Sequence, residues 1–295
     1  MRTTYRMMGL ADYITLANGL LGAGAIFFII MAVGDLQQPY QEGIKSQYIW
    51  AAQLCIILSM IGDVIDGPVA RRYSNRRLLG GSLDIMSDCI SFGVAPAMLI
   101  FVLYGRMGEA TPLWTFFLAA GCCWVIITAM LRLARFDYEK GSDYPWFFGL
   151  SSPANAIFLL SLSSLIWLQP STGIGPGLST WDCDICFGKG FEKPWFDFLI
   201  IPGLFISGGL MISDRKLSKV KHGAPMWLSI VAMTTLLAGT LIQLRYTLGA
   251  SPELDEAAGI STFVLFSTTL ILSLIYIIAG PTMVEIELDD TNEGH

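Results

Sequence analysis

Eight apolar segments, each about as long as a helix that crosses a lipid bilayer, dominate the sequence. A hydrocarbon layer of ~30 Å requires about 20 apolar residues in a helix. Lipid offers the backbone no hydrogen-bond partners, so such segments fold as helices unless they close a barrel. The sequence therefore predicts an all-α, polytopic transmembrane bundle of about eight spans. The predicted spans are residues 12–34, 47–65, 82–105, 112–132, 146–168, 197–214, 224–246 and 260–280.

The composition agrees with a membrane protein. Of the 295 residues, 54% are hydrophobic and only 14% are charged, whereas roughly 25% of the residues of a soluble domain are charged. The formal net charge is −6, but the acidic residues gather in a few loops and the C-terminal tail, so this balance favours neither an acidic nor a basic partner. We therefore expect membrane lipids, and no nucleic acid, as partners.

The basic residues of the connections gather on one side of the predicted bundle. Thirteen of the 18 Lys and Arg residues precede the first span or follow the second, fourth and sixth spans. Positively charged connections stay in the cytoplasm. Both termini and the arginine-rich connections are therefore predicted on the cytoplasmic face of the cytoplasmic membrane.

Four aspartates stand at the ends of two neighbouring apolar segments, where ionisable side chains are candidates for function. Asp63 and Asp66 are three residues apart, and Asp84 and Asp88 are four apart. On a helix these spacings keep each pair on one face, with rises of ~4.5 and ~6 Å. A short arginine-rich connection folds the second helix back against the first. The four carboxylates are thus predicted to share a small volume at the cytoplasmic edge.

Carboxylates this close relieve their repulsion by protonation or by binding a multivalent cation. Oxygen ligands favour Mg²⁺ or Mn²⁺, so we predict all four aspartates as metal ligands. The alternative is that the aspartates are helix-end residues paired with arginines of the connection. These arginines are Arg71, Arg72, Arg76 and Arg77.

This stretch resembles the signature of the CDP-alcohol phosphatidyltransferase family. The pattern reads Asp63-x2-Asp66-Gly67-x2-Ala70-Arg71-x8-Gly80-x3-Asp84-x3-Asp88. Residues 92–97, 131–136 and 148–154 are further similar to the membrane-embedded phosphatidylserine and archaetidylserine synthases of that family. The resemblance covers about residues 10–222.

The resemblance implies a core of six helices, usually dimeric, that binds a cytidine diphosphate group and two Mg²⁺ or Mn²⁺ ions. It implies that the four aspartates bind metal and that Asp88 is also the general base. By the same resemblance, four residues line the CDP site: Gly67, Ala70, Arg71 and Gly80.

The predicted enzyme is a metal-dependent transferase of phospholipid biosynthesis. It would move a phosphatidyl or archaetidyl group from CDP-diacylglycerol or CDP-archaeol to the hydroxyl of L-serine and release CMP. Within the family, glycerol phosphate or inositol phosphate is the alternative acceptor. Outside the family, the alternative is an ion or metal transporter, which predicts carboxylates spread through the depth of the bilayer.

Several other residues carry weaker signals. Arg132 and Arg135 have two interpretations. Either they bind the acceptor or a lipid phosphate by bidentate bonds, or they only anchor their span. Asn18, in the first span, contacts either the nucleotide or another helix. Cys183 and Cys186 form a lone Cys-x2-Cys, which is a weak zinc signal and favours a disulfide or two free thiols.

Three regions are predicted along the chain. Residues 1–222 form the catalytic membrane domain, and residues 223–282 add two transmembrane helices. Residues 283–295 form an acidic cytoplasmic tail, which is predicted to be disordered from Glu285 because it has few apolar residues to bury.

Overall fold

The computed structural model describes residues 9–33, 44–73, 80–105, 112–139, 146–168, 198–218, 223–249 and 256–293. Within these ranges, the side chains of residues 10–11, 68–73, 139, 218, 223–224, 256–257 and 285–293 are not described. The elements, in chain order, are α1 (Leu10–Ala32), α2 (Ser46–Tyr73), α3 (Gly80–Asp88), the π-helix η2 (Cys89–Val94), α4 (Ala95–Tyr104), α5 (Pro112–Glu139), β1 (Trp146–Phe148), α6 (Ser152–Trp167), α8 (Ile200–Met211), β2 (Lys216–Ser218), α9 (Gly223–Leu248) and α10 (Glu256–Glu293).

The structure confirms a polytopic helical membrane protein. Six stretches of the described chain are long and apolar enough to cross a bilayer, with α3, η2 and α4 forming one continuous span from Gly80 to Tyr104. The other two predicted segments contain the shorter apolar helices α6 and α8, of 16 and 12 residues. Each of the eight predicted segments therefore holds a helix.

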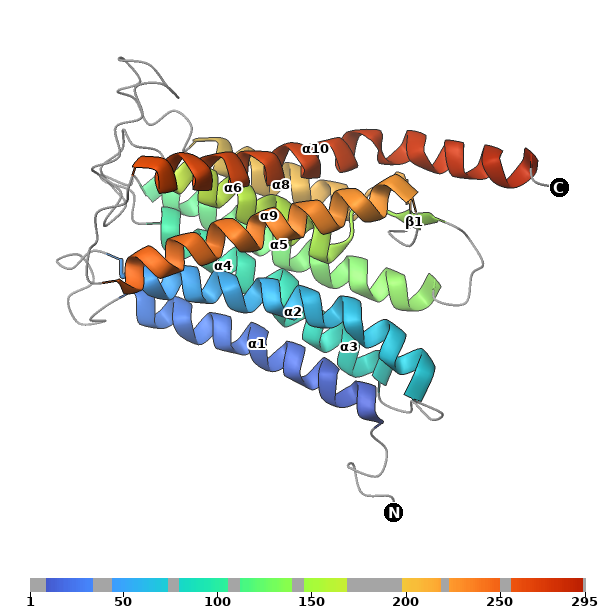
Figure 1. The fold of residues 1–295 in the computed structure, drawn as a ribbon, viewed down its shortest axis with the longest axis horizontal. Coiled ribbons are helices and arrows are strands. Elements are labelled where there is room, and N and C mark those ends of the chain that lie inside the picture. Colours follow the sequence, from blue (N-terminus) through green and yellow to red (C-terminus); the bar gives the residue numbers. More distant parts are fainter. Residues whose placement is uncertain are drawn as a thin grey trace.

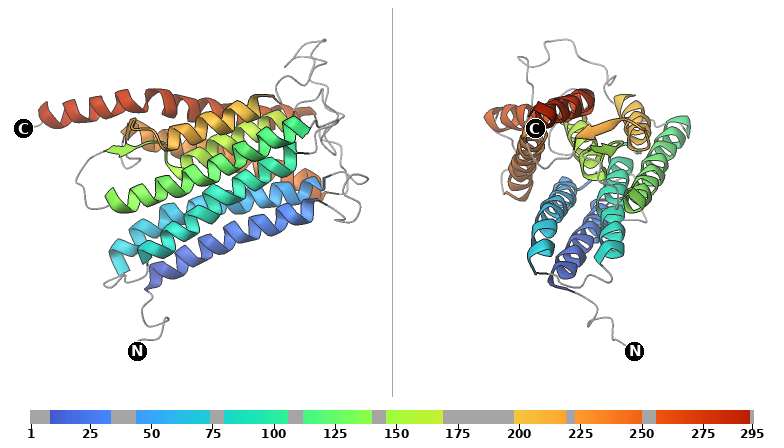
Figure 2. Two further views of the ribbon diagram at one scale, coloured as in Figure 1. Left: turned by 180° about the vertical axis from the view of Figure 1, so that it is seen from behind. Right: turned by 90° about the vertical axis from the view of Figure 1, so that its right-hand side faces the viewer.

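The helices run side by side, with their axes close to parallel (Figure 1). The start of α1 and the end of α10 lie at the same end of the bundle, as an even number of passes requires. The end of α2, the start of α3 and strand β1 also lie there. The view along the bundle shows α9 and α10 together on one side (Figure 2). They pack against each other and against α2 and α6.

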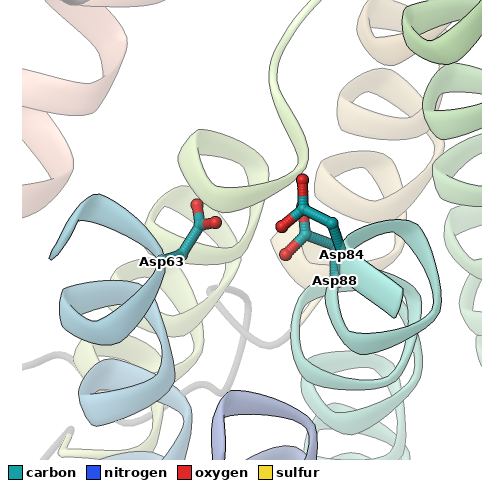
Figure 3. A group of neighbouring side chains, drawn as sticks. All are labelled: Asp63, Asp84 and Asp88. Carbon is teal, nitrogen blue, oxygen red and sulfur yellow. The ribbon is translucent and has the colours of Figure 1, made fainter. Parts of the chain in front are cut away.

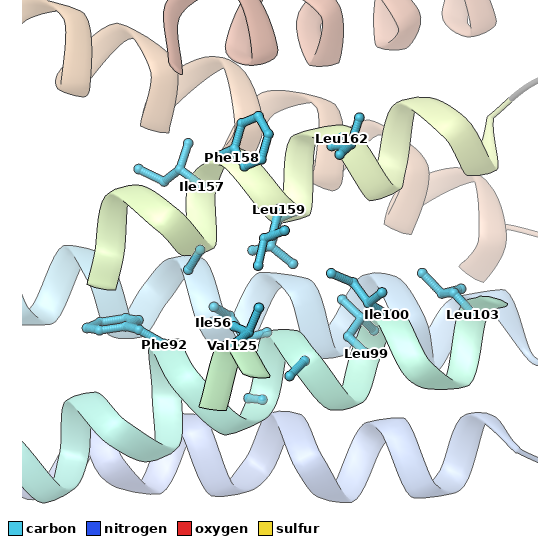
Figure 4. Close-up of a cluster of buried hydrophobic side chains, with 14 of the residues drawn as sticks. Ile56, Phe92, Leu99, Ile100, Leu103, Val125, Ile157, Phe158, Leu159 and Leu162 are labelled. Atoms are coloured by element: carbon cyan, nitrogen blue, oxygen red, sulfur yellow. The ribbon is translucent and has the colours of Figure 1, made fainter. Parts of the chain in front are cut away.

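Helix α6 is the centre of the bundle, and most of its side chains are buried. It contacts α4, α5, α8, α9, α10 and η2. Its inner face packs against a hydrophobic cluster in which Leu159 lies near Ile56 of α2 and Val125 of α5 (Figure 4). Its 16 residues are fewer than the about 20 that a hydrocarbon layer requires of a spanning helix.

The start of the fifth predicted span is not helical. Residues 146–148 form β1, which pairs antiparallel with β2 in the register Phe147 to Leu217. Gly149 then takes a φ of +72°, a conformation that glycine adopts without steric cost. Its N–H donates to Arg215 O at 2.9 Å. The apolar run of residues 146–168 therefore divides into a strand, a glycine turn and a helix.

A π-helix interrupts the third span directly after Asp88. The Ala95 N–H bonds Ile90 O, five residues earlier. Pro96 follows, and it cannot donate the next backbone hydrogen bond. Single π-turns of this kind rotate the residues on either side relative to a regular helix, and they are frequent at functional sites.

The prediction of a disordered acidic tail is wrong as far as Glu293, because α10 continues to that residue. The residues after Pro281 include no further proline or glycine before Gly294, so nothing in the sequence breaks the helix there. The end of α10 extends past the other helices (Figure 1).

Small residues let α1 approach the third span closely. A Cβ added to Gly22 would lie 2.3 Å from Ser91 Oγ and 2.9 Å from Ser91 Cα, whereas a Cβ added to Gly24 would meet nothing within 4 Å. Close contacts through small residues are a common way for membrane helices to associate. Gly22 therefore sets the distance between α1 and η2.

We predict that Gly22→Ala destabilises the protein by about 1–3 kcal/mol, the usual cost of overpacking. Gly24→Ala is the matched control, and it should leave stability unchanged or raise it, because alanine is the better helix former. Thermal unfolding in detergent, followed by tryptophan fluorescence, measures both variants. Equal melting temperatures would contradict the close contact.

Candidate active site

Three of the four predicted metal ligands converge in the structure. Asp63 on α2 faces Asp84 and Asp88 on α3 across a narrow gap (Figure 3). One carboxylate oxygen from each residue lies within 4.8 Å of the other two. The i, i+4 spacing of Asp84 and Asp88 puts both on the face of α3 that looks toward α2.

The fourth aspartate, Asp66, lies outside this group of three. It is 3% exposed, and its Oδ2 accepts a hydrogen bond from Thr15 Oγ1 of α1. Asp66 therefore ties the end of α2 to α1. The role of Thr15 was not predicted from the sequence.

Helix α1 holds α2 and α3 in place through hydrogen bonds to its own backbone. Ser87 Oγ donates to Thr15 O, and Ser91 Oγ donates to Asn18 O, each at 3.1 Å. Ser59 of α2 also donates to Asn18 O at 3.1 Å. Because Ser87 is adjacent to Asp88, these bonds fix the rotation of α3 that aims its carboxylates at α2.

Asn18 lies between helices. It is 5% exposed, and a Cβ added to Gly62 would sit 1.9 Å from its Oδ1. The amide thus packs directly against the backbone of α2, one residue before Asp63. The structure therefore places Asn18 in a helix contact, and contact with a nucleotide stays a prediction.

The predicted CDP-site residues differ in their surroundings. Gly67 is exposed, and a Cβ added there would meet nothing within 4 Å, so the backbone at this position is open to a ligand. Gly80 is buried at the start of α3. The side chains of Ala70 and Arg71 lie outside the described residues.

Among the described residues, Arg132 of α5 is the basic side chain that lies beside the carboxylates. It is 8% exposed, and its guanidinium carbon lies 5.2 Å from the ring centre of Phe136 and 5.9 Å from that of Phe147. Its charge interacts with Asp63 and Asp88. Strand β1 therefore helps to position Arg132 by placing Phe147 beside it.

Arg135 lies in a different setting from Arg132. Its Nη1 is 2.9 Å from Asp214 Oδ1, and its guanidinium carbon lies 4.8 Å from the ring centre of Phe148. The Asp214 side chain is 87% exposed. Arg135 thus joins α5 to the segment after α8 near the surface, and its role toward a substrate stays a prediction.

The cluster of three carboxylates suits a small divalent cation. Two oxygens on opposite sides of a Mg²⁺ ion are about 4.2 Å apart, because each Mg–O bond is about 2.1 Å. One oxygen from each of the three aspartates lies within 4.8 Å of the others, which is close to this distance. Asp63, Asp84 and Asp88 supply only oxygen atoms, the ligands that Mg²⁺ and Mn²⁺ prefer.

The arrangement does not resemble an ion pathway. The three carboxylates lie together (Figure 3), toward the end of α2 and in α3, whose start lies at the same end of the bundle (Figure 1). A pathway would place acidic groups at successive depths. The other weak metal signal, Cys183 and Cys186, lies outside the described residues.

The fold and this site define a polytopic membrane protein with a cluster of carboxylates inside its helical bundle. Residues 8–183 match the family model described as CDP-alcohol phosphatidyltransferase. This match spans more than half of the 295 residues. The chain belongs to this family, as its sequence pattern predicted.

Curated relatives share its sequence at moderate identity. A protein of Saccharomyces cerevisiae is 30% identical over 167 residues, which are 54% of each chain. A Mycobacterium leprae protein is 36% identical over 138 residues, 44% of this chain and 42% of the relative. A Helicobacter pylori protein is 32% identical over 197 residues, 65% of this chain and 71% of the relative.

All three relatives are named CDP-diacylglycerol--serine O-phosphatidyltransferase. The chain spans about half the length of the yeast and M. leprae relatives that it matches. The similarity therefore places this chain near proteins with that name.

We predict that Mn²⁺ or Mg²⁺ raises the melting temperature of the purified protein by several degrees. A cation that binds only the folded state stabilises it by about 2.7 kcal/mol at 100 times its dissociation constant. Asp84→Asn should remove most of this shift, because it replaces a charged ligand with a neutral amide. The measurement is thermal unfolding with and without the cation, after treatment with a chelator.

Asp214→Asn is the matched control, since this exposed carboxylate lies outside the group. It should keep the full cation-dependent shift. An equal shift in the Asp84→Asn protein would contradict a cation site at these carboxylates.

Proposed function

We propose that this chain transfers a phosphatidyl- or archaetidyl-type group from a CDP-linked lipid to the hydroxyl of L-serine and releases CMP. The observation that carries this proposal is the convergence of Asp63, Asp84 and Asp88 from two helices within the region that matches the family model. The names of the relatives favour serine as the acceptor.

We propose that the four aspartates hold two divalent cations. The four aspartates offer eight oxygen atoms, the kind of ligand that Mg²⁺ and Mn²⁺ prefer. When bound, the cations would bind the diphosphate of the donor and stabilise the charge that develops on departing CMP. Gly67, whose backbone is open, would let the nucleotide approach closely, and Gly80 would line the same site at the start of α3.

Asp88 has the role of general base in this proposal. The acceptor oxygen attacks the phosphorus that carries the lipid, and the bond from that phosphorus to the CMP oxygen breaks. The proton of the acceptor hydroxyl moves to a carboxylate oxygen of Asp88. Asp88 suits this role because Ser87 and Ser91, on either side of it, are anchored to α1. This anchoring limits its motion relative to Asp63.

Arg132 would hold a negative group of the substrates next to the carboxylates. It is buried, it rests on two aromatic rings, and it lies close enough to Asp63 and Asp88 for their charges to interact. A planar guanidinium binds a carboxylate or a phosphate through two parallel bonds. Arg135 would act at the surface through its pair with Asp214.

We further propose that the protein lies in the cytoplasmic membrane as a homodimer, with the site and both termini facing the cytoplasm. The excess of basic residues in the connections at the carboxylate end supports this orientation. The end of α5, with Arg132 and Arg135, and the short sheet with Lys216 lie at that end. The start of α2, just after Lys45, and the end of α9, with Arg245, lie toward the other (Figure 1).

We predict that Asp88→Asn lowers turnover by at least 100-fold, because general-base catalysis typically contributes 10²–10⁴-fold. Binding of the CDP-lipid should change little, since the other three aspartates remain. The measurement is release of CMP from CDP-diacylglycerol and L-serine with Mn²⁺, together with binding of the CDP-lipid.

Asp137→Asn serves as the control, because Asp137 is exposed on α5 and lies outside the carboxylate group. It should retain activity near that of the unmodified protein. An Asp88→Asn protein with normal turnover would exclude Asp88 as the base.

Serine should be the preferred acceptor among small alcohols. Purified protein is given CDP-diacylglycerol or CDP-archaeol with L-serine, glycerol phosphate or inositol phosphate, and CMP is measured. An acceptor that carries a phosphate needs additional basic side chains near the site. Among the described side chains, Arg132 is the only buried arginine or lysine. Faster CMP release with a phosphate-bearing acceptor would contradict the assignment of serine.

A further inference from the structure

The first turn of α6 carries buried polar atoms that the proposed chemistry has not used. Ser152 and Asn155 are both 0% exposed. Ser152 Oγ, Asn155 Oδ1 and Asn155 Nδ2 have no hydrogen-bond partner among the described residues. Buried side-chain polar atoms are normally paired, and leaving an amide unpaired is costly. A polar group from outside the chain would satisfy them.

These atoms face the interior of the bundle. Asn155 lies four residues before Leu159 and therefore shares its face of the helix. Leu159 points into the cluster of Ile56, Val125 and Leu99 (Figure 4). Asn155 thus stands one turn closer to the carboxylate end than this cluster.

The same turn is next to the carboxylate group. Helix α6 contacts η2, which begins at Cys89, directly after Asp88. In Figure 3, the ribbon in the colour of α6 passes behind the gap between Asp63 and the α3 aspartates. Phe92, one turn beyond Asp88, lies under the first turns of α6 in Figure 4. Helix α6 therefore lies beside the site, and Ser152 and Asn155 stand in its first turn, toward the carboxylate end.

The local charge at this turn favours an anionic group. The N-terminus of a helix carries a partial positive charge. In α6 few backbone donors are free, because Pro153 has no N–H and the Asn155 N–H donates to Ser151 O at 2.9 Å. Ser151 Oγ accepts only the Ala154 N–H, at 3.4 Å. Arg132 lies beside Phe147, which precedes Ser152 by five residues. A carboxylate placed here would meet the positive end of the helix and the amide donor of Asn155.

We propose that Ser152 and Asn155 bind the carboxylate and ammonium groups of an α-amino acid acceptor whose hydroxyl gives its proton to Asp88. This inference rests on the proposed transfer to serine. The Asn155 amide has both a donor and an acceptor, so it matches a zwitterion: Nδ2 donates to the carboxylate and Oδ1 accepts from the ammonium. Ser152 Oγ donates to the carboxylate.

The test is Asn155→Leu, which keeps a side chain of similar size and removes both polar functions. The KM for L-serine should rise at least 10-fold, while the KM for the CDP-lipid stays within 2-fold. The melting temperature should stay the same or rise, because an unpaired buried amide has been removed. Asn155→Asp should also raise the KM for serine, since its charge repels the carboxylate.

Ser163→Ala is the matched control. Ser163 lies on the same helix and is 1% exposed, and its Oγ has no partner among the described residues. It is eight residues from Asn155, which is about 12 Å along a helix. The KM of the Ser163→Ala protein for serine should equal that of the unmodified protein.

The outcomes separate this inference from the proposed function. In the first case, the unmodified protein releases CMP with serine. If Asn155→Leu then leaves the KM for serine unchanged, or raises the KM for serine and for the CDP-lipid alike, the proposed acceptor site is wrong and the proposed transfer stands. If the unmodified protein releases no CMP with serine, the proposed function fails. Serine binding to the CDP-saturated protein then tests the site directly, and equal thermal shifts in the unmodified and Asn155→Leu proteins overturn it.

Discussion

The site depends on holding like charges together inside an apolar bundle. Asp63, Asp84 and Asp88 bring oxygens within 4.8 Å of one another, and repulsion between such groups would separate α2 from α3 without compensating contacts. Part of the compensation comes from α1, whose backbone carbonyls at Thr15 and Asn18 accept hydrogen bonds from serines of both helices. Helix α1 contributes none of the three carboxylates, yet its hydrogen bonds fix their geometry.

A second support comes from the short sheet at the same end of the bundle. Three aromatic side chains of β1 each lie beside a cation: Trp146 beside Lys216, Phe147 beside Arg132 and Phe148 beside Arg135. Pairing with β2 sets the positions of these rings. Aromatic faces attract cations without neutralising them, so Arg132 keeps its charge for the carboxylates or for a substrate.

The last two helices are part of this structure as well. Gln53 of α2 donates to Thr240 Oγ1 of α9 and accepts from Ser164 of α6, each at 2.9 Å. Hydrogen bonds between polar side chains inside a membrane hold helices together. Helix α10 also contributes Tyr276, which is buried and interacts with the charge of Arg132. The region after residue 222 thus packs onto the core and reaches the neighbourhood of the site.

The sequence alone determined the helical membrane fold, the family and the aspartates, because hydropathy and i, i+3 or i, i+4 spacing are local properties. It also held an unused signal for α1, since Thr15, Asn18, Gly19 and Gly22 recur at helical spacing. Only the tertiary structure decided that Asp66 turns to Thr15, that residues 146–148 pair with β2, and that Asn155 is buried without a partner. These features depend on contacts between segments distant in the chain, which no local pattern encodes.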